Sequence, residues 1–289
     1  MKNINIFVLA LLAFAFTFCG DPGVDISESK FEPKIVVEGY LYPGQPVKDI
    51  RLMRNYELNT TIDESALALT PGGNSVAVNI NGIPLIYDAD NQQYYTNELI
   101  PEYNKPYTIE VSADIDGRQL YTTCTTLTPA EGFEIVKNNL GIIKYRESDP
   151  VLEFKPSPGT DFYAFSIIAD NADLDNFIYD NAYNPDIKRE DVEEDFDEYY
   201  FQMEGIINVD SYSDKTVTYE IPGFDTWFYS DYTVTIYAGD NNFKDFLITA
   251  NDVQEPDGNF IEPSFHFEGD GIGIFGSAIT GKVKFTLVK

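Results

Sequence analysis

The sequence predicts a mainly β protein, because apolar and polar residues alternate with a period of two along most of the chain from residue 34 onward. Residues 161–169 show this pattern well. Turn signals separate such runs, and Asn81-Gly82 is a strong one because both residues tolerate the positive φ angles of a two-residue hairpin turn. Residues 241–253 differ: their apolar side chains recur three and four positions apart, which predicts one helix.

The spacing of the runs predicts two domains. About seven short strands within residues 34–128 indicate an immunoglobulin-like β-sandwich. A second β-rich domain is expected over residues 129–289, with the helix at 241–253 and an acid-rich insertion at 170–198. Four glycines between residues 269 and 276 lack the lysine of a phosphate-binding loop, so a tight turn or bulge is expected there.

The composition limits the partners of the chain. Acidic residues outnumber basic ones 48 to 19, and the formal net charge is -29. Such a surface repels phosphate backbones, which argues against nucleic-acid binding, and it disfavours electrostatic docking on anionic lipid. Hydrophobic residues make up 43% of the 289 residues, enough for a core, which argues against a disordered chain.

The N-terminus has the features of a lipoprotein signal. An apolar run follows Lys2 and ends directly at Cys19, so residues 1–18 are predicted to be a signal peptide and Cys19 the lipidated first residue of the mature chain. Residues 19–33 are polar and predict a flexible tether. The alternatives are a plain secretory signal with an incidental cysteine, or a short membrane anchor.

Three segments together resemble a known family. They are residues 35–41 (IVVEGYL), 258–263 (GNFIEP) and 268–276 (EGDGIGIFG). With the signal, they resemble the Bacteroidota lipoproteins catalogued as domain of unknown function 4249, over roughly residues 20–289. Members of that family are typically encoded beside TonB-dependent outer-membrane receptors, so the resemblance implies an accessory role in uptake. It implies no catalytic residue.

Catalytic constellations are sparse. His266, the single histidine, stands between two aromatic residues, and we expect a structural role. Cys124 lies in a run of threonines that predicts a strand, where a small buried side chain is expected. A Cys124–His266 dyad is the alternative, and no zinc signature is present. We therefore expect no enzyme activity, although paired carboxylates leave a carbohydrate-active hydrolase as a third hypothesis.

The acid-rich insertion is the sharpest local feature. Seven of the nine residues from 190 to 198 are acidic. Calcium prefers six to eight oxygen ligands, so this insertion is a candidate calcium site. The alternatives are a solvated acidic loop and a docking site for a cationic patch. The candidate ligands are Asp170, Asp173, Asp175, Asp195 and Asp197.

Aromatic residues gather in the irregular parts of the second half. Exposed aromatic rings stack on sugars and dominate protein interfaces, whereas buried ones build the core. The candidates for ligand or partner contact are Tyr183, Trp227, Phe228 and Tyr229.

The leading hypothesis is a lipid-anchored outer-membrane accessory protein without enzyme activity, facing the periplasm or the cell surface. It would associate with a TonB-dependent receptor and help to capture or pass a substrate. The second hypothesis is a cell-surface adhesin or structural envelope module that calcium makes rigid. No cofactor is expected apart from this calcium.

Overall fold

The computed structural model describes residues 31–57, 61, 66–209, 215–250 and 263–289. The expected signal peptide, Cys19 and most of the expected tether lie outside the described residues. Residues Pro33–Lys289 cluster as one unit by their contacts.

Alternation along the chain produces strands with one buried face, as expected. In β1 (Ile35–Leu41), the side chains of Ile35, Val37 and Leu41 are fully buried and those between them are half-buried. The strands β7 (Pro106–Ile115) and β8 (Arg118–Leu127) form a hairpin with the same alternation. Its turn residues, Asp116 and Gly117, have φ angles of 55° and 76°, which suit the twist of a hairpin.

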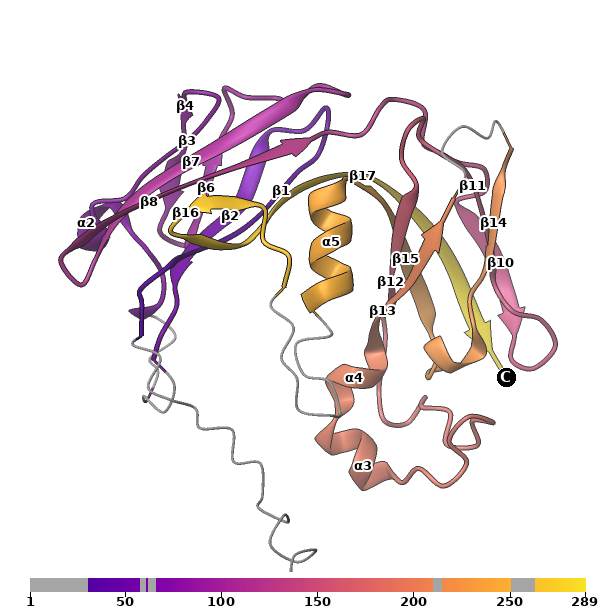
Figure 1. Cartoon of the computed structure of the whole chain (residues 1–289). Helices are drawn as coiled ribbons and strands as arrows, with labels where there is room; N and C mark the ends of the chain where they lie inside the picture. Colours follow the sequence, from indigo (N-terminus) through magenta and orange to yellow (C-terminus); the bar gives the residue numbers. More distant parts are fainter. Residues whose placement is uncertain (1–30, 58–60, 62–65, 210–214, 251–262) are drawn as a thin grey trace, which may run out of the picture. The chain divides into compact units, whose positions relative to one another are not determined.

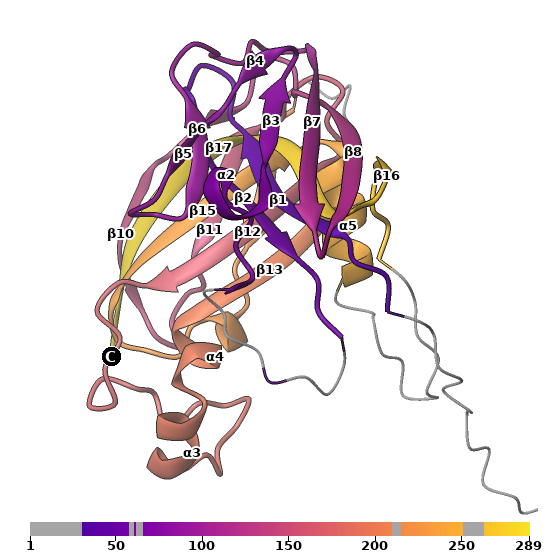
Figure 2. The ribbon, with the colours of Figure 1, turned by 90° about the vertical axis from the view of Figure 1, so that its left-hand side faces the viewer.

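The N-terminal half is a sandwich of two sheets (Figure 2). The first has the order β16-β8-β7-β3-β4, with β16 (Phe267–Gly269), β3 (Ala77–Ile80) and β4 (Ile83–Pro84). The second is one end of a nine-stranded sheet, in the order β1-β2-β6-β5, with β2 (Val47–Arg54), β6 (Gln93–Thr96) and β5 (Ile86–Asp88). Apolar side chains from both sheets fill the core between them. The expected immunoglobulin-like sandwich within a mainly β chain is confirmed.

The second half is also built from two sheets. The other end of the nine-stranded sheet contains β13 (Phe201–Asn208), β12 (Phe162–Ala169), β15 (Asp231–Gly239) and β17 (Gly271–Val288), and β10 (Asn139–Lys144) pairs with β17. A three-stranded sheet contains β14 (Val217–Glu220), β11 (Val151–Lys155) and β9 (Glu134–Ile135). A second core, rich in aromatic side chains, lies beneath these strands.

One strand belongs to both halves. Residues 271–277 of β17 pair in parallel with β1, and residues 278–286 pair antiparallel with β15 (Figure 1). The domain boundary expected at residues 128–129 stays a prediction. The backbone hydrogen bonds of β17 join a strand from before this boundary, β1, to a strand from after it, β15. The turn expected across residues 269–276 is confined to a bend at Asp270, and the glycines from Gly271 onward lie in the strand.

The expected helix is present as α5 (Asn241–Ala250), and residues 251–253 of the predicted segment lie outside the described residues. Its residue Phe243 is buried, and β17 curves over the helix (Figure 1). Among the residues that the structure describes, it adds four short helices that the sequence analysis did not expect: α2 (Pro71–Asn74), α3 (Arg189–Glu194), α4 (Phe196–Tyr200) and the 3-10 helix η2 (Gly223–Asp225). No helix in the described part of the chain is long and apolar enough to span a membrane.

The pairing of β17 with β1 requires a glycine at position 273. Gly273 has a φ angle of 104°, and a Cβ there would lie 2.2 Å from the carbonyl oxygen of Val37. We therefore expect Gly273→Ala to lower the free energy of unfolding by about 3 kcal/mol, because the substitution adds both backbone strain and overlap. Chemical denaturation of the purified protein measures this change.

The matched control is Gly72→Ala in α2, where a Cβ meets no atom within 4 Å and φ is not positive. This variant should be as stable as the wild type or slightly more so. Equal stability of the Gly273→Ala variant and the wild type would contradict the close approach of β17 to β1.

Candidate functional site

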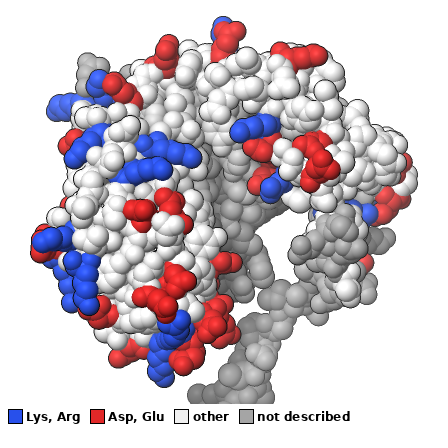
Figure 3. Space-filling view, turned by 180° about the vertical axis from the view of Figure 1, so that it is seen from behind, with Lys and Arg blue, Asp and Glu red and all other residues white. Residues whose placement is uncertain are grey.

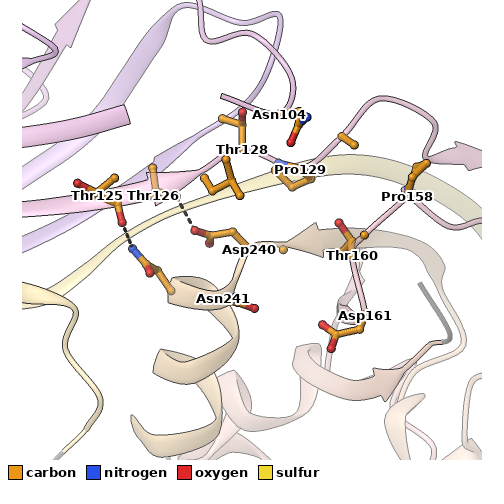
Figure 4. A pocket seen from close by; sticks show the side chains of 15 residues that line it. Asn104, Thr125, Thr126, Thr128, Pro129, Pro158, Thr160, Asp161, Asp240 and Asn241 are labelled. Carbon is orange, nitrogen blue, oxygen red and sulfur yellow. Dashed lines mark hydrogen bonds between the residues drawn. The ribbon is translucent and has the colours of Figure 1, made fainter. Parts of the chain in front are cut away.

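Two places in the described part of the chain gather polar or aromatic side chains that could serve a function. The first is a pocket of about 360 Å³ where β8 leaves the sandwich (Figure 4). It is lined by residues 125–130, 158–161 and 239–242 and by Asn104, and is called the junction pocket below. Its groups are mainly hydroxyls, amides and backbone atoms, with two carboxylates, Asp161 and Asp240.

Asp240 is at the centre of the junction pocket. Its Oδ2 accepts a hydrogen bond from the Thr126 hydroxyl in β8 at 2.5 Å, as Figure 4 shows. Its Oδ1 accepts from the backbone N–H of Ser277 in β17 at 3.0 Å and of Phe243 in α5 at 3.1 Å. One carboxylate thereby joins a strand of each sheet and begins the helix, as expected from an N-cap aspartate.

Asn242, in the first turn of α5, also links the helix to β8 and β17 by hydrogen bonds. Its Nδ2 donates to the carbonyl oxygens of Thr125 at 2.8 Å and Phe275 at 2.9 Å. The Ser277 hydroxyl lies 3.0 Å from the Thr126 hydroxyl oxygen and donates to the Leu127 carbonyl at 3.1 Å. The polar groups of the junction pocket are thus engaged with one another, which indicates that they hold the two halves together.

The protonation of Asp240 reflects this environment. Burial raises the pKa of the Asp240 carboxyl group, and the hydrogen bonds from Thr126, Ser277 and Phe243 oppose part of that rise. A buried carboxylate is tolerated where donors surround it, and here three described groups donate to it.

Cys124 and His266 do not form a dyad. Cys124 is buried in β8, with Asn242 Nδ2 3.5 Å from its Sγ, and burial raises the pKa of its thiol to about 12, so it is not an activated nucleophile. His266 precedes β16, is exposed, and lies 2.9 Å from the Asp245 carboxylate through Nε2. Cys124 is the small buried strand residue that was expected, whereas His266 is on the surface rather than between core aromatics.

The candidate calcium ligands divide between two segments. Asp173 and Asp175 lie in a turn after β12, where Asp173 accepts from the Asp175 N–H and Asp175 pairs with Arg189 at 2.8 Å. Asp195 and Asp197 lie at the start of α4. Asp170, at the end of β12, accepts from the Thr233 hydroxyl at 2.7 Å. Within the described ranges no three acidic, histidine or cysteine side chains are grouped to hold a metal ion, and the calcium site stays a prediction.

The aromatic candidates divide between core and surface. Phe228 is fully buried and packs against Phe177 at 5.2 Å, so the expectation of a contact residue is wrong for Phe228. Trp227 and Tyr229 are half-buried against the same core. Tyr183 is 61% exposed and agrees with the expectation.

Tyr183 belongs to the second place of interest, which we call the aromatic corner: Tyr183, Phe224, Gly223 and Asp149. The rings of Tyr183 and Phe224 meet edge to face, with centroids 5.4 Å apart and planes at 85°, and Phe224 is 44% exposed. The sequence analysis did not select Phe224, Gly223 or Asp149. The pair Pro222-Gly223 was the available signal, since it predicts a turn that brings its neighbour to the surface.

The surface charge is not uniform. On the face shown in Figure 3, lysine and arginine side chains gather toward one edge and are interspersed with acidic ones. Exposed ion pairs such as Lys155–Glu134, at 2.6 Å, also bring opposite charges together on the surface of the protein. The net charge of -29 is therefore a property of the whole chain rather than an even coat on each face.

These features define a mainly β protein with an immunoglobulin-like sandwich. The chain belongs to the family described as Domain of unknown function (DUF4249), whose model matches residues 23–280. No curated protein matches the chain in sequence.

Solved structures with some likeness to this chain include three at 9–10% sequence identity. They are a chimeric titin Z1Z2-Z1Z2 tandem (10% identity, 89% of this chain and 97% of that one, TM-score 0.25), domains 4 and 5 of the S-layer protein SbsC (10%, 90% and 98%, 0.20) and domains MG0-NIE-MG1 of alpha-2-macroglobulin from Escherichia coli (9%, 90% and 73%, 0.22). At these TM-scores the alignments carry no argument about function.

The buried carboxyl group of Asp240 is expected to make the free energy of unfolding depend on pH. Because its folded pKa is raised above the ordinary value of 3.8, the folded state holds the proton more tightly than the unfolded state. This contribution to stability is full below the ordinary pKa and is lost as the pH rises through the folded pKa. We expect the unfolding free energy of the wild type, minus that of Asp240→Asn, to fall as the pH rises above the ordinary pKa of 3.8.

Chemical denaturation of both proteins at several pH values from about 4 upward measures the difference. A difference that stays constant, or that rises with pH, would contradict the raised pKa. The Asp161→Asn variant is the control, because Asp161 lines the same pocket but is about half exposed and pairs with Lys244.

Phe224 and Phe228 lie four residues apart, the first on the surface and the second in the core. We expect Phe228→Ala to lower the unfolding free energy by about 3–5 kcal/mol, because it leaves a cavity in the aromatic core. Phe224→Ala should change it by only about 0.5 kcal/mol, because Phe224 lies at the surface. Thermal and chemical unfolding measure both, and equal losses in the two variants would show that the aromatic corner is part of the core.

Proposed function

We propose that this chain is a lipid-anchored accessory protein of the outer membrane that associates with a TonB-dependent receptor and helps to capture or pass its substrate. The observation that carries the proposal is the family match over residues 23–280, together with a signal-like segment that ends at Cys19. The resemblance to that family implies the receptor, and lipidation of Cys19 supplies the anchor. The face of the membrane that the protein occupies is either periplasmic or external.

The geometry supports binding rather than catalysis. Cys124 is buried and its thiol pKa is raised, and His266 contacts Asp245 rather than a nucleophile. The junction pocket uses its polar groups to join β8, β17 and α5. The aromatic corner, by contrast, exposes two large rings, which is typical of residues that anchor an interface.

Co-purification tests the proposal directly. The protein carries a C-terminal tag, outer membranes are solubilised in mild detergent, and mass spectrometry identifies what is recovered with it. We expect a TonB-dependent receptor in a stoichiometric amount. Recovery of the lipoprotein alone, from membranes in which the receptor is detected, would overturn the stable partnership and favour the envelope-module hypothesis.

Cys19→Ser is the matched control, because it removes the acylated thiol and leaves the described residues unchanged. This variant should leave the membrane fraction and recover little receptor from it. If it stays in the outer membrane as strongly as the wild type, the lipid anchor at Cys19 is wrong.

A further inference from the structure

We propose that the aromatic corner receives an arginine or lysine side chain of the partner polypeptide. This inference rests on the proposed function, because the partner is the receptor in that scheme. It names the chemistry of one contact: a cationic side chain that lies against the rings of Tyr183 and Phe224 and is neutralised by Asp149.

The ring geometry is the first argument. The rings of Tyr183 and Phe224 are nearly perpendicular, with planes at 85° and centroids 5.4 Å apart, and both rings are substantially exposed. The face of an aromatic ring carries negative electrostatic potential, so a cation placed over it is attracted. Exposed phenylalanine and tyrosine rings in contact also remain available to a partner, unlike Phe228, which is enclosed.

A carboxylate beside the rings is the second argument. The Cβ position of Gly223 lies 3.2 Å from the Tyr183 ring and 3.8 Å from Asp149 Oδ1, so the glycine backbone packs closely against the ring and the carboxylate lies next to both. Asp149 is exposed, and among the described residues it has no ion-pair partner. A cation that touches the ring therefore lies within reach of a carboxylate.

The described part of the chain shows the same chemistry within itself. The Arg146 guanidinium lies 5.1 Å from the centroid of the Tyr145 ring, and its Nη1 is 3.8 Å from the Asp180 carboxylate. Arg146 also donates to the Asp180 carbonyl oxygen. Since Arg146 is engaged by Asp180 and Tyr145, it leaves Asp149 to another cation.

The corner is held in place before any partner arrives. Asn181, fully buried, accepts the backbone N–H of Tyr183 at its Oδ1 at 2.9 Å, which positions the residue that carries the exposed ring. Phe224 lies in η2, where the Asp225 N–H donates to the Pro222 carbonyl oxygen at 3.0 Å. Such preorganisation reduces the entropy lost on binding.

Charge selects a cation over a neutral or anionic group. A chain with a net charge of -29 attracts basic partners and repels acidic ones at long range. The rings stand on the surface rather than inside an enclosed cavity, which suits a side chain presented by a polypeptide better than a small molecule.

A peptide titration tests the chemistry without the receptor. The probes are N-acetyl-Gly-Arg-Gly-amide and its glutamine counterpart, and saturation transfer from protein to peptide in NMR measures their affinities for the full chain. We expect the arginine peptide to bind more tightly, and Tyr183→Leu, Phe224→Leu and Asp149→Asn each to weaken it about two- to fivefold. Equal binding of the two peptides, or variants that bind as well as the wild type, would overturn the inference.

Control variants separate a local site from general attraction to an acidic protein. Tyr121→Leu removes a 52% exposed tyrosine on β8, and Asp90→Asn removes an exposed carboxylate in the turn between β5 and β6. Both should bind the arginine peptide like the wild type. A loss as large as that of the corner variants would show non-specific charge attraction and overturn the inference.

Receptor co-purification with the same variants distinguishes this inference from the proposed function. A receptor recovered with the wild type but reduced with Tyr183→Leu supports both. A receptor recovered equally with every variant leaves the proposed function standing and overturns the inference. If the wild type recovers none, the proposed function fails, and the peptide titration alone decides the chemistry of the corner.

Discussion

The rest of the structure depends on the sharing of β17 between the two halves of the chain. Its first part pairs with β1 and its later part with β15, so the backbone groups of three strands are satisfied only while the two halves stay in register. Unpaired buried N–H and C=O groups cost more than a typical hydrogen bond contributes, so separation of the halves is strongly opposed. Gly273 follows from this requirement, because a side chain there would overlap Val37 of β1.

The Asp240 network acts at the same junction by different physics. A buried carboxylate is costly, yet it receives donors from β8, β17 and α5, which an apolar residue of similar size would not do. Its contribution is therefore mainly directional: it specifies how the start of the helix meets two strands. The pairing of β17 holds the halves together, and the carboxylate sets their register with the helix.

The sequence predicted what depends on local pattern. Alternation identified β1, β7 and β8, each of which buries one face, and it also identified β12, although β12 is buried on both faces. Three- and four-residue spacing identified α5. The pairing of β17 could not be predicted from the sequence, because β1 lies more than two hundred residues away and no local signal encodes the pairing. The helices α3 and α4 are too short to show a helical period.

Among the aromatic residues of the candidate site, Phe224 and Phe228 look alike in sequence. Only the turn of η2 and the β-bridge between Phe177 and Phe228 place Phe224 on the surface and Phe228 in the core.

Recognition of a basic partner would combine two terms in the binding free energy that act at different distances: the attraction by the net charge and the direct contact with the aromatic corner. The net charge acts over roughly a Debye length and raises the rate of encounter with basic partners, an effect that salt weakens. The aromatic corner acts only in contact, through ring faces that are already oriented, and so it governs how long a partner stays. Because these terms depend differently on salt, removal of a ring should leave the salt dependence of association unchanged while it speeds dissociation. Removal of the Asp149 charge should alter both, since that carboxylate contributes to the long-range field and to the contact.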